Sequence, residues 1–157
     1  MRMIPTDGAV KYLPLARRHL ASVIRLCRVE RWPSYLVSVG RTWRALTAPG
    51  SCTVVAVEDG EVVGFAQLQS DGLIQAHLTL IAVSRAHRRQ GIGRRLLEEG
   101  LARAGGLRVD LVSTEGAHAF YRAFEHRRFP GFRIYPQLPR TRGGGRDRRR
   151  RRDRRAR

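Results

Sequence analysis

The sequence predicts a single α/β domain, and three observations support this prediction. Two β-branched runs, CTVVAVE and EVVGFAQLQ, are joined through Asp59-Gly60, which is a strong signal for a β-hairpin. Segments with helical periodicity precede and follow these runs. At 157 residues, 42% of them hydrophobic, the chain has the size of one ordinary domain with a core of its own.

The first half of the chain predicts a strand, two helices and three antiparallel strands. Leu20, Val23 and Cys27 recur at helical spacing in the first helix, and Pro33 suits the first turn of the second. Asp71-Gly72 marks the turn before the last of these strands. The expected elements are a strand at 9–13, helices at 16–28 and 33–46, and strands at 52–58, 61–69 and 74–83.

The second half predicts alternating helices and strands. Ile92, Leu96 and Leu97 belong to the apolar stripe of a helix that Gly105-Gly106 ends. This helix is expected from about 91 to 104, followed by a strand at 107–113, a short helix at 117–124 and a closing strand at 132–136.

The positive charge is concentrated at the C-terminal end. The chain has 31 basic and 13 acidic residues, a net charge of +18, and residues 140–157 contribute +9 of it through 11 arginines and two aspartates. We therefore divide the chain into a domain at 1–139 and a disordered Arg-rich tail at 140–157. Two interpretations of the tail stay open: a contact with a polyanion such as RNA, DNA or an anionic membrane, and an arginine bias without function.

Composition also argues against several classes of protein. No apolar run is long enough for a membrane span, and the N-terminus lacks the apolar region of a signal peptide, so a cytoplasmic location is expected. Cys27 and Cys52 stand alone and are expected as buried, reduced thiols. No Cys/His cluster has metal-ligand spacing and no Ser/His/Asp arrangement is evident, so neither a metal nor a catalytic triad is predicted.

The segment from Arg88 to Gly93, RRQGIG, has the features of an anion site. Glycines there allow close approach of the backbone to a ligand, and the first amides of the following helix have no partner within it. Arginines on both sides add positive charge. A Rossmann dinucleotide site is the rival interpretation, but Leu96 stands at the third glycine position and the preceding strands appear antiparallel in pattern.

Together with the strand before it, IAVSRAHRRQGIGRRLL resembles the GCN5-related N-acetyltransferase (GNAT) family, a likeness that covers about residues 9–136. The resemblance implies a twisted mixed sheet of about six to seven strands, with helices on both faces and a splay between strands 4 and 5 that admits acetyl-CoA. It implies that strand backbone contacts the pantetheine arm and that loop amides hold the pyrophosphate. The cofactor-binding residues it implies are Ile81, Ala82, Val83, Arg88, Arg89, Gln90, Gly91, Ile92, Gly93 and Arg94.

A second matching segment is AHAFYRAFEHRRFPGF, which resembles the helix and strand that follow in the family. The resemblance implies that Tyr121 protonates the departing coenzyme A thiolate, a role that a phenol can fill. The alternative is a half-buried core aromatic. Two departures from the family pattern are Thr114, where an asparagine is usual, and the stretch from Phe124 to Phe129, where Leu-Gly-Phe is usual.

The acceptor amine must lose a proton before it attacks, and His77 is the candidate base, acting directly or through water. His77 could equally be an ordinary strand residue, and Asp71 and Glu61 are weaker alternatives. The candidate acceptor-pocket residues are Trp32, Tyr35, Trp43, Phe132 and Tyr135, and each could instead belong to the core.

The predicted function is acetyl transfer from acetyl-CoA to a primary amine, on a small molecule or a protein, within one ternary complex. The positive charge of the chain repels polyamines and aminoglycosides and attracts acidic surfaces, which favours an acceptor on a protein or bound to nucleic acid, although local acids such as Glu30, Asp71 and Glu115 could line the pocket. The alternative is a basic nucleic-acid-binding protein whose tail binds while the GNAT fold is catalytically inert. A monomer and a homodimer are both compatible with the sequence.

Overall fold

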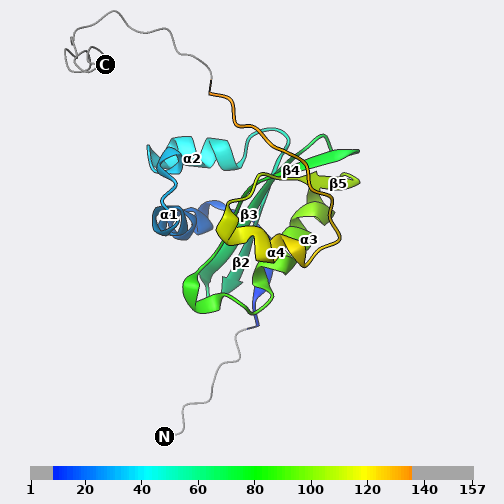
Figure 1. Ribbon diagram of the computed structural model, residues 1–157. Helices are drawn as coiled ribbons and strands as arrows, with labels where there is room; N and C mark the ends of the chain where they lie inside the picture. Colours follow the sequence, from blue (N-terminus) through cyan, green and yellow to red (C-terminus); the bar gives the residue numbers. More distant parts are fainter. Residues whose placement is uncertain (1–8, 136–157) are drawn as a thin grey trace, which may run out of the picture.

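The predicted sheet forms the centre of the structure, a computed structural model that describes residues 9–135 (Figure 1). Its five described strands lie in the order β1-β2-β3-β4-β5, so each strand neighbours the next one in the sequence. All neighbours run antiparallel except β4 and β5, which are parallel. The strands are β1 (Lys11–Pro14), β2 (Ser51–Glu58), β3 (Glu61–Ser70), β4 (Gln75–Val83) and β5 (Arg108–Asp110).

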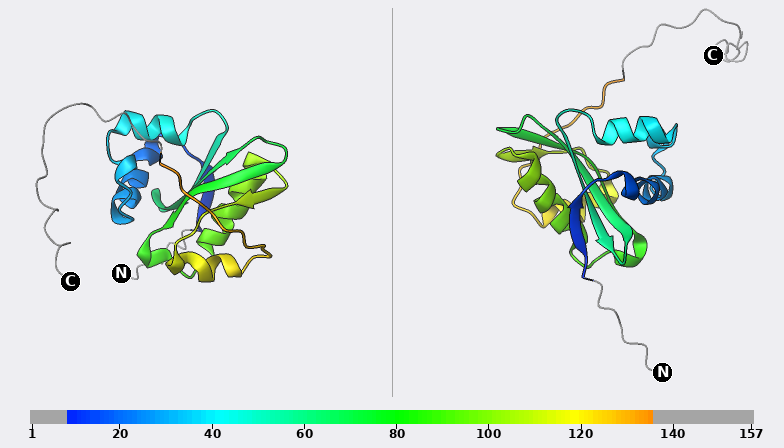
Figure 2. Two further views of the ribbon diagram at one scale, coloured as in Figure 1. Left: turned by 45° about the horizontal axis from the view of Figure 1, so that its top comes forward. Right: turned by 180° about the vertical axis from the view of Figure 1, so that it is seen from behind.

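Helices cover both faces of this sheet, as predicted (Figures 1 and 2). Helices α1 (Leu20–Val29) and α2 (Val39–Leu46) enclose a core around Phe65 on one face. Helix α3 (Ile92–Ala104) packs on the other face around Leu68, and side chains from the region of α4 (His118–Arg122) join that cluster. Short 3-10 turns occur at Arg17–His19, Pro33–Tyr35, Arg85–His87 and Glu115–Ala117. The fold is a mixed α/β sheet with helices on both faces.

Strands β4 and β5 separate after a short contact. Their pairing joins Gln75–His77 to Arg108–Asp110 and goes no further. From Leu78 to Val83, β4 therefore has a partner strand only on its β3 side within residues 9–135. We call the unpaired side of Leu78–Val83 the open edge. This is the splay between strands 4 and 5 that the family resemblance implies.

The prediction of a closing strand at 132–136 is wrong for the residues of that range that the structure describes. Phe132 and Ile134 are 85% and 87% exposed, and residues 132–135 form no strand, while Pro136 lies outside the described range. A strand needs a neighbour for its N–H and C=O groups, and this segment has none among residues 9–135. The described sheet therefore has five strands where six to seven were expected.

Two other boundaries differ for local reasons. The second helix does not run unbroken from Pro33, because Ser38 caps a new start: its hydroxyl accepts a hydrogen bond from the Arg41 N–H at 3.2 Å. The strand expected at 107–113 is reduced to β5, since β4 diverges beyond it. The predicted boundary at 139 and the Arg-rich tail at 140–157 lie outside the described residues.

Candidate functional site

The N-terminus of α3 presents backbone N–H groups without acceptors. The first hydrogen bond of the helix runs from the Arg95 N–H to the Gly91 carbonyl at 3.0 Å. The N–H groups of Ile92, Gly93 and Arg94 therefore have no acceptor within the helix, and no side chain caps this end. Helix α2 differs, because Ser38 caps it. With the positive end of the helix dipole, these free donors favour an anion.

The two glycines of this segment serve different purposes. Gly91 adopts a left-handed conformation with φ of 80°, and a Cβ there would meet nothing within 4 Å. A Cβ on Gly93 would instead lie 3.2 Å from the Phe120 ring. Gly91 thus turns the chain into α3, whereas Gly93 lets α3 pack closely against the helix that carries Phe120. The sequence predicted close approach to a ligand and missed this contact between helices.

The arginines around this N-terminus differ in their availability. The Arg94 guanidinium donates to the Ala123 carbonyl at 2.8 Å and lies 4.3 Å from the Phe124 ring centroid, so its side chain links α3 to the end of α4. Arg95 pairs with Glu99 at 2.9 Å. Arg89 is exposed and forms no ion pair with the residues that the structure describes. Arg89 is therefore available to a phosphate as the structure stands.

The open edge of β4 supplies backbone groups beside the start of α3. The Ser84 N–H donates to the Val63 carbonyl at 2.8 Å, so alternation along the antiparallel ladder turns the backbone groups of Ala82 toward β3 as well. Those of Ile81 and Val83 point to the open edge. Two of the three predicted β4 residues therefore present backbone groups there, and Ala82 does not.

Tyr121 lies on α4, half-buried against the core cluster on the α3 face. A phenol is protonated at neutral pH and can donate its proton, and burial raises the pKa of this one further. The neighbouring Phe120 ring, centred 5.0 Å from the Tyr121 ring, is also the ring next to Gly93. The structure thus brings α4 and the start of α3 together.

The candidate bases lie elsewhere. His77 is exposed and sits on the paired part of β4, opposite Asp110 of β5 and Gln69 of β3. Asp71 accepts three backbone N–H bonds from the turn that follows it, which lower the pKa of its carboxyl. Glu61 pairs with Arg25. Asp71 and Glu61 therefore have structural partners, and His77 does not lie on the open edge.

The predicted acceptor residues fall into two groups. Trp32, Tyr35 and Trp43 are partly buried against the cluster on the α1 face, where Trp32 meets the Phe65 ring edge-on. Phe132 and Tyr135 are exposed in the segment without regular structure. The three α1-face aromatics share one cluster, and Phe132 and Tyr135 are not part of it.

Two polar arrangements escaped the sequence analysis. His87 Nδ1 lies 2.6 Å from Ser84 Oγ, and its Nε2 lies 2.8 Å from a Glu58 oxygen. This chain ties the end of β2 to the loop that leads into α3. The second arrangement is an ion pair in which Arg88 Nη2 lies 2.7 Å from Glu30 Oε1. The Ser-x-x-His spacing is a sequence signal for the contact between Ser84 and His87. The contacts with Glu58 and Glu30 depend on the fold.

Neither cysteine is disposed to react. Cys27 is buried, which raises the pKa of its thiol to about 11, and Cys52 is half-buried with a pKa raised for the same reason. Both are free thiols in separate clusters. Residues 9–135 contain no group of three or more His, Cys, Asp or Glu side chains that could hold a metal ion. No helix in this range is long and apolar enough to cross a membrane.

A hollow opens at another part of the molecule. Lys11, Arg18 and His19 contribute to it, with Val57 and the β2-β3 turn at Asp59 and Gly60. None of its lining residues belongs to β4, α3 or α4. Since free helix amides and the open edge lie away from it, we place the candidate site at the start of α3.

Comparison with known proteins places the chain, rather than the individual site residues, in a family. The model of the acetyltransferase (GNAT) family matches residues 18–125. That range includes α1, the sheet from β2 onward, the start of α3 and Tyr121. No curated protein sequence matches the chain significantly.

Solved structures share the fold. An acetyltransferase from Trypanosoma brucei aligns with 81% of this chain and 99% of its own, at TM-score 0.65 and 21% identity. An aminoglycoside acetyltransferase from an uncultured soil metagenomic sample, in complex with sisomicin, aligns with 83% of this chain and 97% of its own. The TM-score is 0.66 and the sequence identity is 19%. AAC(6')-Iy, in complex with the bisubstrate analogue CoA-S-monomethyl-acetylneamine, aligns with 84% of this chain and 100% of its own. The TM-score is 0.67 and the sequence identity is 16%.

Proposed function

Because this chain belongs to the GNAT family of acetyltransferases, we propose that it transfers an acetyl group from acetyl-CoA to a primary amine. Both substrates are held at once, and the amine attacks the thioester carbonyl without an acetyl-enzyme. The observation that carries the proposal is the start of α3, whose free N–H groups lie beside the open edge of β4.

Three parts of the site have separate roles in binding the donor. The N–H groups of Ile92, Gly93 and Arg94, with the Arg89 side chain, hold the pyrophosphate of the donor. The backbone groups of Ile81 and Val83 orient the pantetheine arm and the thioester carbonyl along the open edge. Arg88, Gln90 and Gly91 shape the loop between them. These contacts fix the carbonyl carbon where an amine can reach it.

Tyr121 supplies the proton for the leaving thiolate. A phenol is protonated at neutral pH, burial raises its pKa further, and α4 adjoins the start of α3 through Phe120. As the C–N bond forms and the C–S bond breaks, the phenol proton passes to sulfur. His77 lies on the paired part of β4, so the proton of the acceptor ammonium reaches it only through water.

Calorimetry with two ligands tests the proposal. The full chain should bind acetyl-CoA with micromolar affinity, and S-acetylpantetheine, which lacks the phosphates, should bind at least about 100-fold more weakly. The truncated ligand needs no altered protein, so folding cannot confuse the result. Equal affinity for the two ligands, or no binding of acetyl-CoA at millimolar concentration, would contradict the proposal.

The amine acceptor is then sought by following release of the CoA thiol. The neighbours in complex with sisomicin and with an acetylneamine analogue suggest small amines as the first probes. Residues 17–48, which carry α1 and α2, contain seven arginines and a single acidic residue. Since this charge repels polycations, we expect an amine with nearby acidic groups to be a better acceptor than an aminoglycoside.

A further inference from the structure

Glu30 occupies a position that is unfavourable for a carboxylate. It is the C-cap residue of α1, where the negative end of the helix dipole repels an anion. The next residue, Arg31, adopts a left-handed conformation with φ of 58°. The Glu30 side chain is only 27% exposed. A charge in such a place needs a compensating partner or a function.

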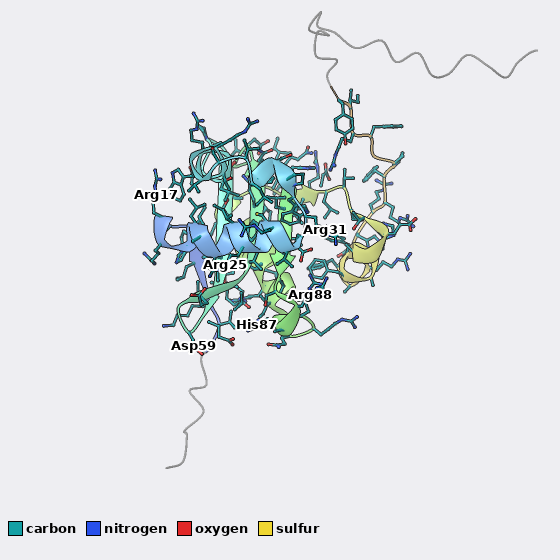
Figure 3. All side chains as sticks on the ribbon, turned by 90° about the vertical axis from the view of Figure 1, so that its left-hand side faces the viewer. Arg17, Arg25, Arg31, Asp59, His87 and Arg88 are labelled. Carbon is teal, nitrogen blue, oxygen red and sulfur yellow. The ribbon has the colours of Figure 1, made fainter. Side chains whose placement is uncertain are left out.

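The partner is Arg88, the first residue of the RRQGIG segment. Its Nη2 lies 2.7 Å from Glu30, and its Nε donates to the Val83 carbonyl at 3.0 Å. Figure 3 shows Arg88 below Arg31, which follows the C-terminal end of α1. A single planar guanidinium therefore spans from α1 to the open edge of β4. It holds the Glu30 carboxylate close to that edge.

This arrangement conflicts with a bound donor. The Val83 carbonyl is one of the groups that face the open edge, and Arg88 occupies it. A pyrophosphate at the start of α3 carries more negative charge than one carboxylate and accepts more hydrogen bonds from a guanidinium. The Arg88 side chain is 47% exposed, so a pyrophosphate can reach it, whereas the 27% exposed Glu30 carboxylate would then need another cation.

We propose that Arg88 exchanges its ion pair with Glu30 for one with the donor pyrophosphate, and that the Glu30 carboxylate then binds the ammonium of the acceptor. This inference rests on the proposed function and adds an acceptor-binding residue and an order of binding to it. Donor binding exposes the Val83 carbonyl and the Glu30 carboxylate together. The acceptor site is therefore incomplete until the donor has bound.

Affinity for CoA tests the exchange of Arg88. Glu30→Gln removes the competitor for Arg88, so CoA should bind about threefold more tightly, whereas Arg88→Gln should bind about tenfold more weakly. In the Arg88→Gln background, Glu30→Gln should have no further effect. The matched control is Glu61→Gln, which removes the acid of the other ion pair of α1, Arg25–Glu61, and should leave the affinity unchanged.

Two CoA thioethers test the second step without an identified acceptor. S-(3-aminopropyl)-CoA carries an ammonium beyond the sulfur, and S-butyl-CoA has the same length without charge. The wild type should prefer the amine by about tenfold. Glu30→Gln should lose this preference, and Glu61→Gln should retain it.

The outcomes separate the two proposals. Suppose that the wild type binds CoA and that Glu30→Gln has the same CoA affinity and the same preference for the amine thioether. The proposed donor site then stands and the role of Glu30 is wrong. A wild type without preference for the amine would also overturn the role of Glu30. A wild type that binds no CoA would overturn both. Thermal unfolding of each variant shows that it is folded.

Discussion

Burial favours the uncharged form of two individual side chains. Tyr121 is half-buried among apolar neighbours on the α3 face, and desolvation raises the pKa of its phenol. His19 is buried at the start of α1, and desolvation lowers the pKa of its imidazole. In both cases burial favours the uncharged form. The Tyr121 phenol carries its proton at neutral pH, and desolvation favours the neutral imidazole of His19.

Replacing Tyr121 separates catalysis from packing. Tyr121→Phe keeps the ring and removes the proton donor, so kcat should fall by about 100-fold while the Kd for acetyl-CoA changes less than twofold. Steady-state kinetics and calorimetry measure the two effects. A variant with full activity and lower unfolding temperature would show that the hydroxyl serves stability alone.

His19 predicts a pH dependence of stability. Its Nδ1 accepts the Ala16 N–H at 3.1 Å, and its folded pKa lies below the unfolded value of about 6.5. The unfolded chain therefore binds the proton first, and the stability contributed by neutral His19 is lost as pH falls below about 6.5 through the folded pKa. His19→Asn keeps an acceptor without titrating there. Urea unfolding at pH 7.5 and 5.5 should show a larger loss for the wild type than for the variant.

At the scale of elements, the start of α3 and the open edge of β4 form one site because the loop between them is held in place. His87 links Ser84 to Glu58, and Arg94 links α3 to Ala123 at the end of α4. Arg89 and Gly91 take left-handed conformations in the turn. The chain thus enters α3 with the first N–H groups of the helix free of intrahelical acceptors.

A matched pair of glycines tests the turn. Gly91 and Gly60 have φ of 80° and 84°, and a Cβ on either would meet nothing within 4 Å. Alanine should therefore lower the free energy of unfolding by a similar amount, about 1 kcal/mol, in both variants. Only Gly91→Ala should also weaken acetyl-CoA binding, by about tenfold or more. Equal acetyl-CoA affinity in the two variants would argue against an anion site at the start of α3.

At the scale of the whole molecule, the charge is divided between two regions. Residues 1–139 carry +9, and residues 140–157, outside the described range, carry another +9. The Arg-rich segment has few apolar residues. The proposed donor site consists of residues before Phe124. We therefore expect donor binding and any polyanion binding to separate on truncation.

A chain that ends at Pro139 tests this separation. It should bind acetyl-CoA as tightly as the full chain. Binding of a duplex DNA oligonucleotide should be weaker in the truncated chain, and in the full chain it should fall steeply with salt concentration. Fluorescence anisotropy at 50 and 200 mM salt measures it. If truncation abolished acetyl-CoA binding, the predicted boundary at 139 would be wrong.

Much of the fold could be predicted because its signals are local. The Asp59-Gly60 turn, the helical spacing around Val23 and Leu96, and the glycines of RRQGIG each act within a few residues. The closing strand at 132–136 failed for the opposite reason. Its β-rich composition is local, but strand formation requires a neighbour that the described residues do not offer.

By itself, the sequence determined the order of the elements as far as α4, the free amides at the start of α3 and the resemblance to acetyltransferases. Only the tertiary structure decided where β4 leaves β5, that Gly93 packs on Phe120, and that Arg88 joins Glu30 to the Val83 carbonyl. Arg88 and Glu30 are 58 residues apart in the chain. No spacing rule relates such residues, because their contact depends on how α1 and β4 pack across the sheet.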